Sequence, residues 1–254
     1  MGMPVTVEIV DGSARPASID RVYEYFEYID ATFSTYKDNS EISRINRHEL
    51  TPAQSSPDMQ AIFALADQTR RETDGHFDIR RDGRYDPSGI VKGWAIQNAA
   101  GLLEAEGYEN YYVEAGGDLQ AMGHNSQGRN WRVGIQNPFN SAEIIKVLSV
   151  SNRGVATSGT YVRGEHIYNP KKHGQPVNEI VSLTVVGPNI YDADRFATAA
   201  FAMGLPGIHF IEGLEGFDGL ESSLKLPVEV LGHDVRFRYT LIDRVGSERV
   251  QIAG

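Results

Sequence analysis

The stretch DADRFATAAFAMG, residues 192–204, has the composition of a buried helix and yet carries three charged residues near its start. Five alanines and three larger apolar residues make up most of it. Asp194 and Thr198 are four residues apart, so on a helix they share one face. They are either a helix cap with a surface threonine or two oxygen ligands for a hard cation.

Helical and strand patterns surround this stretch without strict alternation. Apolar residues recur at helical spacing over 19–33 and 57–74, and a third helix is expected to end near Gly107. This mixture favours an α+β fold of mixed sheets with packed helices over a doubly wound sheet. Strands are predicted at 5–10, 110–117, 131–135, 144–151, 180–186, 226–231 and 235–242.

The composition limits the partners and the chemistry. The chain has 254 residues, which suits one large domain or two small subdomains. Its 34 acidic and 24 basic residues give a formal net charge of −10. This charge argues against nucleic acid or an anionic membrane as the main partner, and a polyanionic substrate would need a local basic residue or a metal ion. Cysteine is absent, which excludes disulfides, thiolate metal sites and cysteine nucleophiles.

The N-terminus, MGMPVTVEIVDG, has no basic region followed by an apolar run, so we recognise no signal peptide. No apolar run in the sequence is long enough to serve as a membrane anchor. We therefore expect a cytoplasmic protein, unless a leader has been removed.

The segment DPSGIVKGWA, residues 86–95, combines Asp86, Gly89 and Lys92 at a helix start. Glycine, exposed backbone groups and a lysine at a helix N-terminus suit a phosphate or another anion. The alternative is a Pro-Gly turn that caps a helix, with Lys92 in solvent, and taken alone this alternative is favoured.

Three further segments carry polar groups. EAGGD, residues 114–118, is in isolation best interpreted as a tight turn. VATSGTYVRGEHIYNP, residues 155–170, contains His166, which is either a general base or a structural histidine. Tyr36 ends a helix, where it either stacks on a ring or packs. The sequence contains no G-x-G-x-x-G, Walker, G-x-S-x-G or H-E-x-x-H motif.

The order of these motifs along the chain resembles that of the ApbE-type FAD:protein FMN transferases, in a compact subgroup. The resemblance runs from MGMPV to at least Gly204 and rests on FSTYKDNSEISRIN, GHFD, DPSGIVKGWA, VEAGGDLQAMG, WRVGIQNP, ATSGTY, HIYNP and DADRFATAAFAMG. It implies a single domain over residues 1–254, with two subdomains around a deep cleft that holds FAD and Mg²⁺.

The implied activity is transfer of FMN from FAD to a Thr or Ser hydroxyl of an acceptor flavoprotein, with release of AMP. FAD would be a substrate and Mg²⁺ the cofactor. Two alternatives stay open: an FAD pyrophosphatase that yields FMN and AMP, and a non-catalytic FAD-binding protein.

The resemblance also assigns residues. The metal ligands would be Asp194, Thr198 and the carbonyl of Gly89. Lys92 would stabilise the AMP leaving group. His166 would be the base for the incoming hydroxyl, with Asp118, Ser158 and Thr160 as alternatives. The residues that contact FAD would be Met1, Tyr36, His76, Phe77, Asp78, Asp86, Lys92 and His166.

The chain departs from the family pattern at two places that concern the acceptor. Glu165–His166 stands where a double histidine is common, which affects the role of His166. Only a few residues separate Asp78 from Asp86, where longer members carry a helical insertion. We therefore expect a more open cleft, and these departures bear on acceptor specificity more than on FAD binding.

Overall fold

The fold is built on an eight-stranded antiparallel sheet with strand order β1-β4-β5-β8-β9-β10-β11-β12. The computed structural model describes residues 2–159, 167–172, 180–223, 238–242 and 249–252. The strands of the sheet are β1 (Val5–Ile9), β4 (Tyr111–Ala115), β5 (Asp118–Met122), β8 (Arg153–Gly159), β9 (Ser182–Gly187), β10 (Asp218–Ser223), β11 (Arg238–Ile242) and β12 (Arg249–Ile252).

Two hairpins and six α-helices complete the described part of the chain. The hairpins pair β2 (Arg80–Arg81) with β3 (Arg84–Tyr85), and β6 (Trp131–Asn137) with β7 (Asn140–Val150). The helices are α1 (Pro16–Phe33), α2 (Glu41–Asn46), α3 (Pro57–Glu72), α4 (Ser88–Ala105), α5 (Ile190–Met203) and α6 (Pro206–Glu212), with short 3-10 turns at Pro52–Gln54 and Pro170–Lys172. Within these described residues no helix is both long and apolar enough to cross a membrane.

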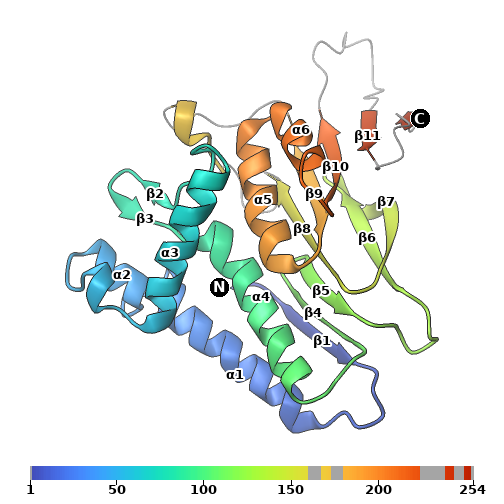
Figure 1. Cartoon of the computed structure of the whole chain (residues 1–254), viewed down its shortest axis with the longest axis horizontal. Coiled ribbons are helices and arrows are strands. Elements are labelled where there is room, and N and C mark those ends of the chain that lie inside the picture. Colours follow the sequence, from blue (N-terminus) through green and yellow to red (C-terminus); the bar gives the residue numbers. More distant parts are fainter. Residues whose placement is uncertain (1, 160–166, 173–179, 224–237, 243–248, 253–254) are drawn as a thin grey trace.

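The helices and the β6–β7 hairpin cover opposite faces of the sheet (Figure 1). Successive side chains of a strand point to opposite faces, and the two hydrophobic clusters follow this rule. On β8, Ala156 packs in the cluster that contains α4 and α5, whereas its neighbour Val155 packs with Trp131 and Ile135 of the hairpin. The expected α+β fold of sheets with packed helices is confirmed.

Helix α5 forms where the alanine-rich stretch predicted it. Its N-cap is Asn189, whose side chain accepts a hydrogen bond from the Asp192 amide at 2.8 Å. Its C-cap is Gly204, with φ of 74°, a backbone conformation that glycine adopts without steric cost. The alanines and Phe201 are buried between the sheet and the neighbouring helices. Burial of a side chain the size of Phe201 contributes about 1.5–3 kcal/mol.

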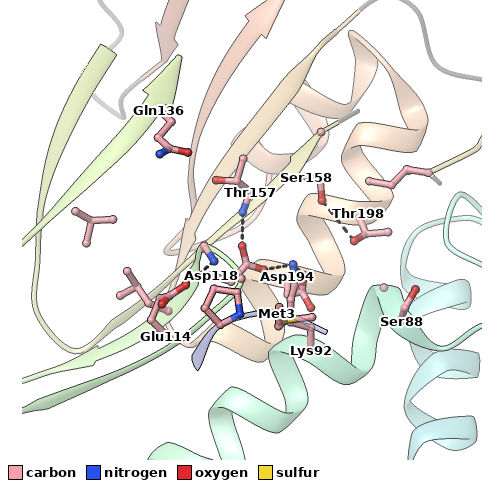
Figure 2. Close-up of a pocket in the computed structure, with 18 of the residues that line it drawn as sticks. Met3, Ser88, Lys92, Glu114, Asp118, Gln136, Thr157, Ser158, Asp194 and Thr198 are labelled. Atoms are coloured by element: carbon pink, nitrogen blue, oxygen red, sulfur yellow. Dashed lines mark hydrogen bonds and ion pairs between the residues drawn. The ribbon is translucent and has the colours of Figure 1, made fainter. Parts of the chain in front are cut away.

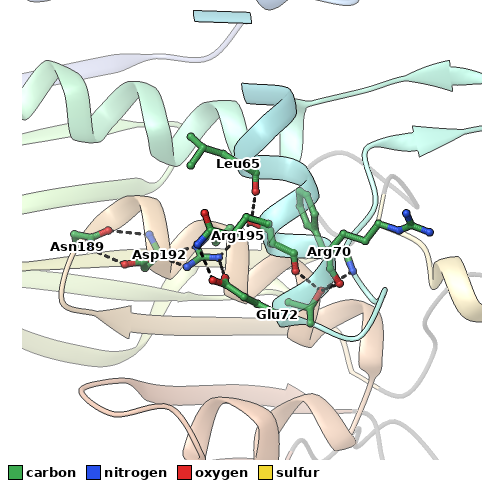
Figure 3. Close-up of polar contacts among 10 residues, drawn as sticks. Leu65, Arg70, Glu72, Asn189, Asp192 and Arg195 are labelled. Atoms are coloured by element: carbon green, nitrogen blue, oxygen red, sulfur yellow. Dashed lines mark hydrogen bonds and ion pairs between the residues drawn. The ribbon is translucent and has the colours of Figure 1, made fainter. Parts of the chain in front are cut away.

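Arg195 is a buried residue of α5 that joins this helix to α3 (Figure 3). Its guanidinium forms an ion pair with Glu72 of α3 and a second one with Asp192, at 2.7 Å. It also donates to Thr69 Oγ1 at 3.3 Å and lies 3.9 Å from the centroid of the Phe196 ring. The charges at 192 and 195 therefore have a structural role, which leaves Asp194 and Thr198 for the cavity described below.

Most predicted elements are present, with differences where local periodicity is weak. The third helix begins at Ser88, so Lys92 lies beyond its first turn. The predicted strand 226–231 lies outside the described residues, as does the start of the strand predicted at 235–242. Elements that the sequence patterns did not indicate are β2, β3, β5, β8, β10, β12 and α6.

Candidate functional site

A large cavity, about 1630 Å³ in volume, opens at the edge where the helical layer meets the β4–β5 turn and the β6–β7 hairpin. Its walls come from the loops after α1 and α3, the start of α4, the middle of α5, the start of β5, the end of β8, and strand β6. Figure 2 shows that Lys92, Asp118 and Asp194 converge at its base.

The base of the cavity depends on a close approach of α4 and α5. Gly93 faces Asp194: a Cβ atom at position 93 would lie 2.5 Å from the Asp194 Cβ and 2.8 Å from the Ile190 carbonyl oxygen. The same approach lets the Gly93 amide donate to Asp194 Oδ2 at 2.7 Å. Glycine at 93 therefore fixes one carboxylate oxygen of Asp194, while Oδ1 stays beside Lys92.

Lys92 is held by two carboxylates and is not in solvent, so the favoured surface interpretation of this lysine was wrong. Its Nζ lies 2.5 Å from Asp118 Oδ2 and 3.5 Å from Asp194 Oδ1. Asp118 and Asp194 are only 1% and 2% exposed. Burial raises the pKa of the Asp194 carboxyl to about 7, and Asp118 adds to the rise, whereas Lys92 and the Gly93 amide oppose it.

Asp118 belongs to this cluster because of the turn that precedes it. Gly116 and Gly117 have φ of 61° and 94°, which a two-residue hairpin turn of the primed type requires. Asp118 then begins β5, and its Oδ1 accepts the amide hydrogen of Thr157 on β8 at 2.9 Å. The tight-turn interpretation of EAGGD was correct, and the acid that closes the turn is in addition a partner of Lys92.

Thr198 lies one helical turn after Asp194 and lines the same cavity, as the shared-face argument predicted. Its Oγ1 is 3.5 Å from Ser158 Oγ, which projects from β8 (Figure 2). Gly89 packs directly against this residue, because a Cβ there would lie 3.1 Å from Thr198 Cγ2. The backbone of α4 therefore comes close to the Thr198 hydroxyl, which lies on the same face of α5 as the buried carboxylate of Asp194.

This donor set fits a hard cation only if a ligand supplies further oxygens. Among the described residues, no group of three or more His, Cys, Asp or Glu side chains is arranged to hold a metal ion. One carboxylate, hydroxyls and a nearby backbone are oxygen donors, which Mg²⁺ prefers, and it commonly completes its octahedron with substrate phosphates and water. The residues present therefore fit Mg²⁺ shared with a phosphorylated ligand.

The outer part of the cavity carries aromatic and polar groups. Tyr36 is 90% exposed at the rim, so its ring is open to stack on a ligand. His76 Nδ1 lies 3.1 Å from the Thr73 carbonyl oxygen, and Asp78 Oδ1 accepts the Arg80 amide hydrogen at 2.8 Å. Tyr168, which the sequence patterns did not single out, donates its hydroxyl to the Asp78 carbonyl at 3.0 Å.

The resemblance assigned eleven residues to the metal, FAD or the main catalytic roles, apart from the alternative bases, and nine of these line this one cavity. Met1 and His166 lie outside the described residues. Four residues of the cavity lie inside the quoted motifs but were not assigned a role from the sequence: Ser88, Gln136, Thr157 and Tyr168. The nine are Tyr36, His76, Phe77, Asp78, Asp86, Gly89, Lys92, Asp194 and Thr198.

The fold and the site define an α+β protein whose cleft suits an anionic, aromatic ligand together with a hard cation. The ApbE family model matches residues 1–83 and 79–220. The chain therefore belongs to the ApbE family, as its motif order indicated.

Similar proteins carry one activity in their names. FAD:protein FMN transferase from Haemophilus influenzae is 26% identical, over 80% of this chain and 79% of the relative. The protein of the same name from Vibrio cholerae is 28% identical, over 77% and 75%. The solved structure of flavin transferase ApbE from Vibrio cholerae superimposes with a TM-score of 0.77 at 25% identity, and covers 89% of this chain and 91% of that one.

Proposed function

We propose that this chain is an enzyme of the transferase class that moves FMN from FAD to a Thr or Ser hydroxyl of an acceptor flavoprotein and releases AMP. Residues 1–254 act as one flavin transferase domain. The observation that carries the proposal is the convergence of Lys92, Asp118 and Asp194 beside Thr198 at the base of a cavity large enough for a dinucleotide.

FAD binds along the cavity in this proposal. Tyr36, His76, Phe77 and Asp78 surround the adenine and ribose, together with Met1, and Asp86 and Lys92 flank the diphosphate. Asp194, Thr198 and the Gly89 carbonyl hold Mg²⁺. Mg²⁺ so held polarises the phosphoryl group and offsets its charge, which also lets a chain of net charge −10 accept an anionic substrate.

The chain's own residues position the reacting groups, stabilise the charge on the leaving phosphate and accept the hydroxyl proton. The acceptor hydroxyl oxygen bonds to the phosphorus on the FMN side of the diphosphate. The bond from that phosphorus to the bridging oxygen breaks, and AMP leaves with this oxygen. Lys92 stabilises the charge on the departing phosphate. The hydroxyl proton passes to a base, for which we propose His166; Asp118 is less suited, because Lys92 and the Thr157 amide occupy its two oxygens.

Two other functions give different products. An FAD pyrophosphatase would use water in place of the acceptor, and a non-catalytic FAD-binding protein would release no AMP. Incubation with FAD and Mg²⁺, with AMP measured in the presence and absence of an acceptor protein, separates the three. Acceptor-dependent AMP release with FMN bound covalently to the acceptor supports the transferase. AMP release that no acceptor changes contradicts it.

The metal assignment has its own test with a matched control. Asp194→Ala removes the buried carboxylate and is expected to abolish Mg²⁺-dependent AMP release. Asp20→Ala removes an exposed carboxylate on α1 and should change nothing. Circular dichroism verifies that both variants are folded. Unchanged AMP release by Asp194→Ala would remove this residue from the metal site.

A further inference from the structure

A second, smaller hollow lies on the β6–β7 hairpin beside the main cavity. Its volume is about 370 Å³, and its lining residues are Arg129, Asn130, Arg132, Val147, Leu148 and Ser149. Arg132 lines this hollow and the main cavity alike. The two depressions therefore adjoin each other at Arg132. We call the smaller one the hairpin subsite.

Strand alternation turns one face of the hairpin away from the sheet. Trp131 and Ile135 are buried against the sheet, whereas Arg132 between them is exposed. Register pairs Arg132 with Ser149, and Gly134 with Val147, so these residues share the outward face. Val147 is 44% exposed. The outward face thus combines an apolar surface with cationic groups, close to the mouth of the main cavity.

The guanidinium groups of the two arginines in the hairpin subsite are available to bind a ligand. Within the described part of the chain, neither the Arg129 nor the Arg132 guanidinium makes a hydrogen bond or an ion pair; the Arg129 backbone is bonded to Asn125, through its amide at 3.2 Å and its carbonyl oxygen at 2.8 Å. In a chain of net charge −10, the described residues that line this hollow include two arginines and no carboxylate. A guanidinium binds a carboxylate through two parallel hydrogen bonds, which favours an anionic partner group.

We propose that the hairpin subsite binds an acidic side chain of the acceptor protein, on an extended segment whose Ser or Thr hydroxyl enters the main cavity. This inference rests on the proposed function and names the chemistry of the acceptor. The arginines hold the carboxylate, and Val147, which lies on the same outward face as Arg132, packs against the apolar part of the segment. The attraction also offsets the repulsion between an acidic segment and this acidic chain.

The test measures covalent labelling of synthetic peptides. Each 15-residue peptide has one central Thr and flanks that are Asp/Glu-rich, Ser/Gly-rich or Lys/Arg-rich. The protein is incubated with FAD and Mg²⁺, and the FMN retained on each peptide after denaturation is measured by fluorescence. We expect the acidic peptide to be labelled about tenfold faster than the basic one at low salt. This preference should weaken as salt screens the exposed charges.

Two charge-reversal variants, one just before β6 and one on β7, assign the preference to the hairpin subsite. Arg129→Glu reverses a charge in the hairpin subsite and is expected to lower the acidic-to-basic labelling ratio about tenfold. Lys146→Glu reverses a charge on β7 that is also exposed and lines neither depression, and should keep the wild-type ratio. A ratio taken within one sample does not depend on the folded fraction, so partial unfolding of a variant does not mimic the result.

The outcomes distinguish this proposal from the proposed function. Equal labelling of acidic and basic peptides by the wild type, or an unchanged ratio in Arg129→Glu, overturns the hairpin subsite and leaves FMN transfer intact. An enzyme that releases AMP from FAD but labels no peptide overturns docking of an extended segment. A chain that neither binds FAD nor releases AMP removes the proposed function, and the hairpin subsite with it.

Discussion

Replacement of Gly93 by alanine tests whether the contact of α4 and α5 builds the site. The added Cβ would lie 2.5 Å from the Asp194 Cβ, 2.8 Å from the Ile190 carbonyl oxygen and 3.0 Å from Asp194 Oδ2. Two of these neighbours belong to a backbone or a Cβ and cannot rotate away. The helices must therefore separate, which also lengthens the 2.7 Å hydrogen bond from the residue 93 amide to Asp194.

The expected change in the free energy of unfolding of Gly93→Ala follows from two opposing effects. Overpacking a close-packed contact costs about 1–3 kcal/mol, and a clash with backbone favours the upper end. Exchange of glycine for alanine inside a helix recovers about 0.5–1 kcal/mol. The net loss in the free energy of unfolding is thus about 2 kcal/mol, or about 4–8 °C in Tm for a chain of this size.

Gly101→Ala is the matched control on the same helix. A Cβ at position 101 meets no atom within 4 Å, so only the gain of about 0.5–1 kcal/mol in helix propensity remains. Urea and thermal unfolding compare the two variants, and titration with FAD reports on the site. If Gly93→Ala is as stable as Gly101→Ala and binds FAD like the wild type, the close approach does not position Asp194.

Three further predictions concern charged groups. Arg195→Ala leaves the partly exposed carboxylates of Glu72 and Asp192 without their shared partner, and should lower the free energy of unfolding by about 1–3 kcal/mol in urea titrations, with FAD affinity of the folded protein retained. The Asp194 pKa of about 7 lies above the ordinary 3.8. Without metal the folded state therefore holds more protons than the unfolded state between these values, and stability should fall as pH rises from about 4 to about 7. Asp194→Asn should reduce the difference in stability between pH 5 and pH 7.5, and an identical difference in both proteins would contradict the shift. His166→Ala should slow FMN transfer by about two to four orders of magnitude, the range for loss of a general base, with FAD binding unchanged; equal loss of binding and transfer would make His166 a flavin contact.

The local periodicity of apolar residues was sufficient to predict the long helices, but it was insufficient to predict the central strands. Helix α1 has an amphipathic repeat, and the sequence predicted it to within a few residues. Strands β5 and β8 are buried on both faces, so they show no alternation of apolar and polar residues. Only their pairing with neighbouring strands defines them, and pairing is a long-range property that local patterns do not report.

The same limit applies to the site. Asp194 and Thr198 are four residues apart on one helix, so their shared face was predictable from spacing alone. Asp118 meets Lys92 only because β5 lies beside α4 and α5 in the folded chain. Taken singly, Lys92 was interpreted as a surface residue and Asp118 as part of a turn. The motif order made the family recognisable, whereas the partner of each charge required the fold.

A crystal structure with FAD and Mg²⁺ bound shows directly where the diphosphate and the metal ion lie. We expect a metal ion coordinated by an Asp194 carboxylate oxygen, Thr198 Oγ1 and the Gly89 carbonyl oxygen, with the FAD diphosphate completing its ligands beside Lys92. The adenine should lie toward Tyr36 and His76. A diphosphate bound away from this cluster, or a metal ion held by other residues, would contradict the account.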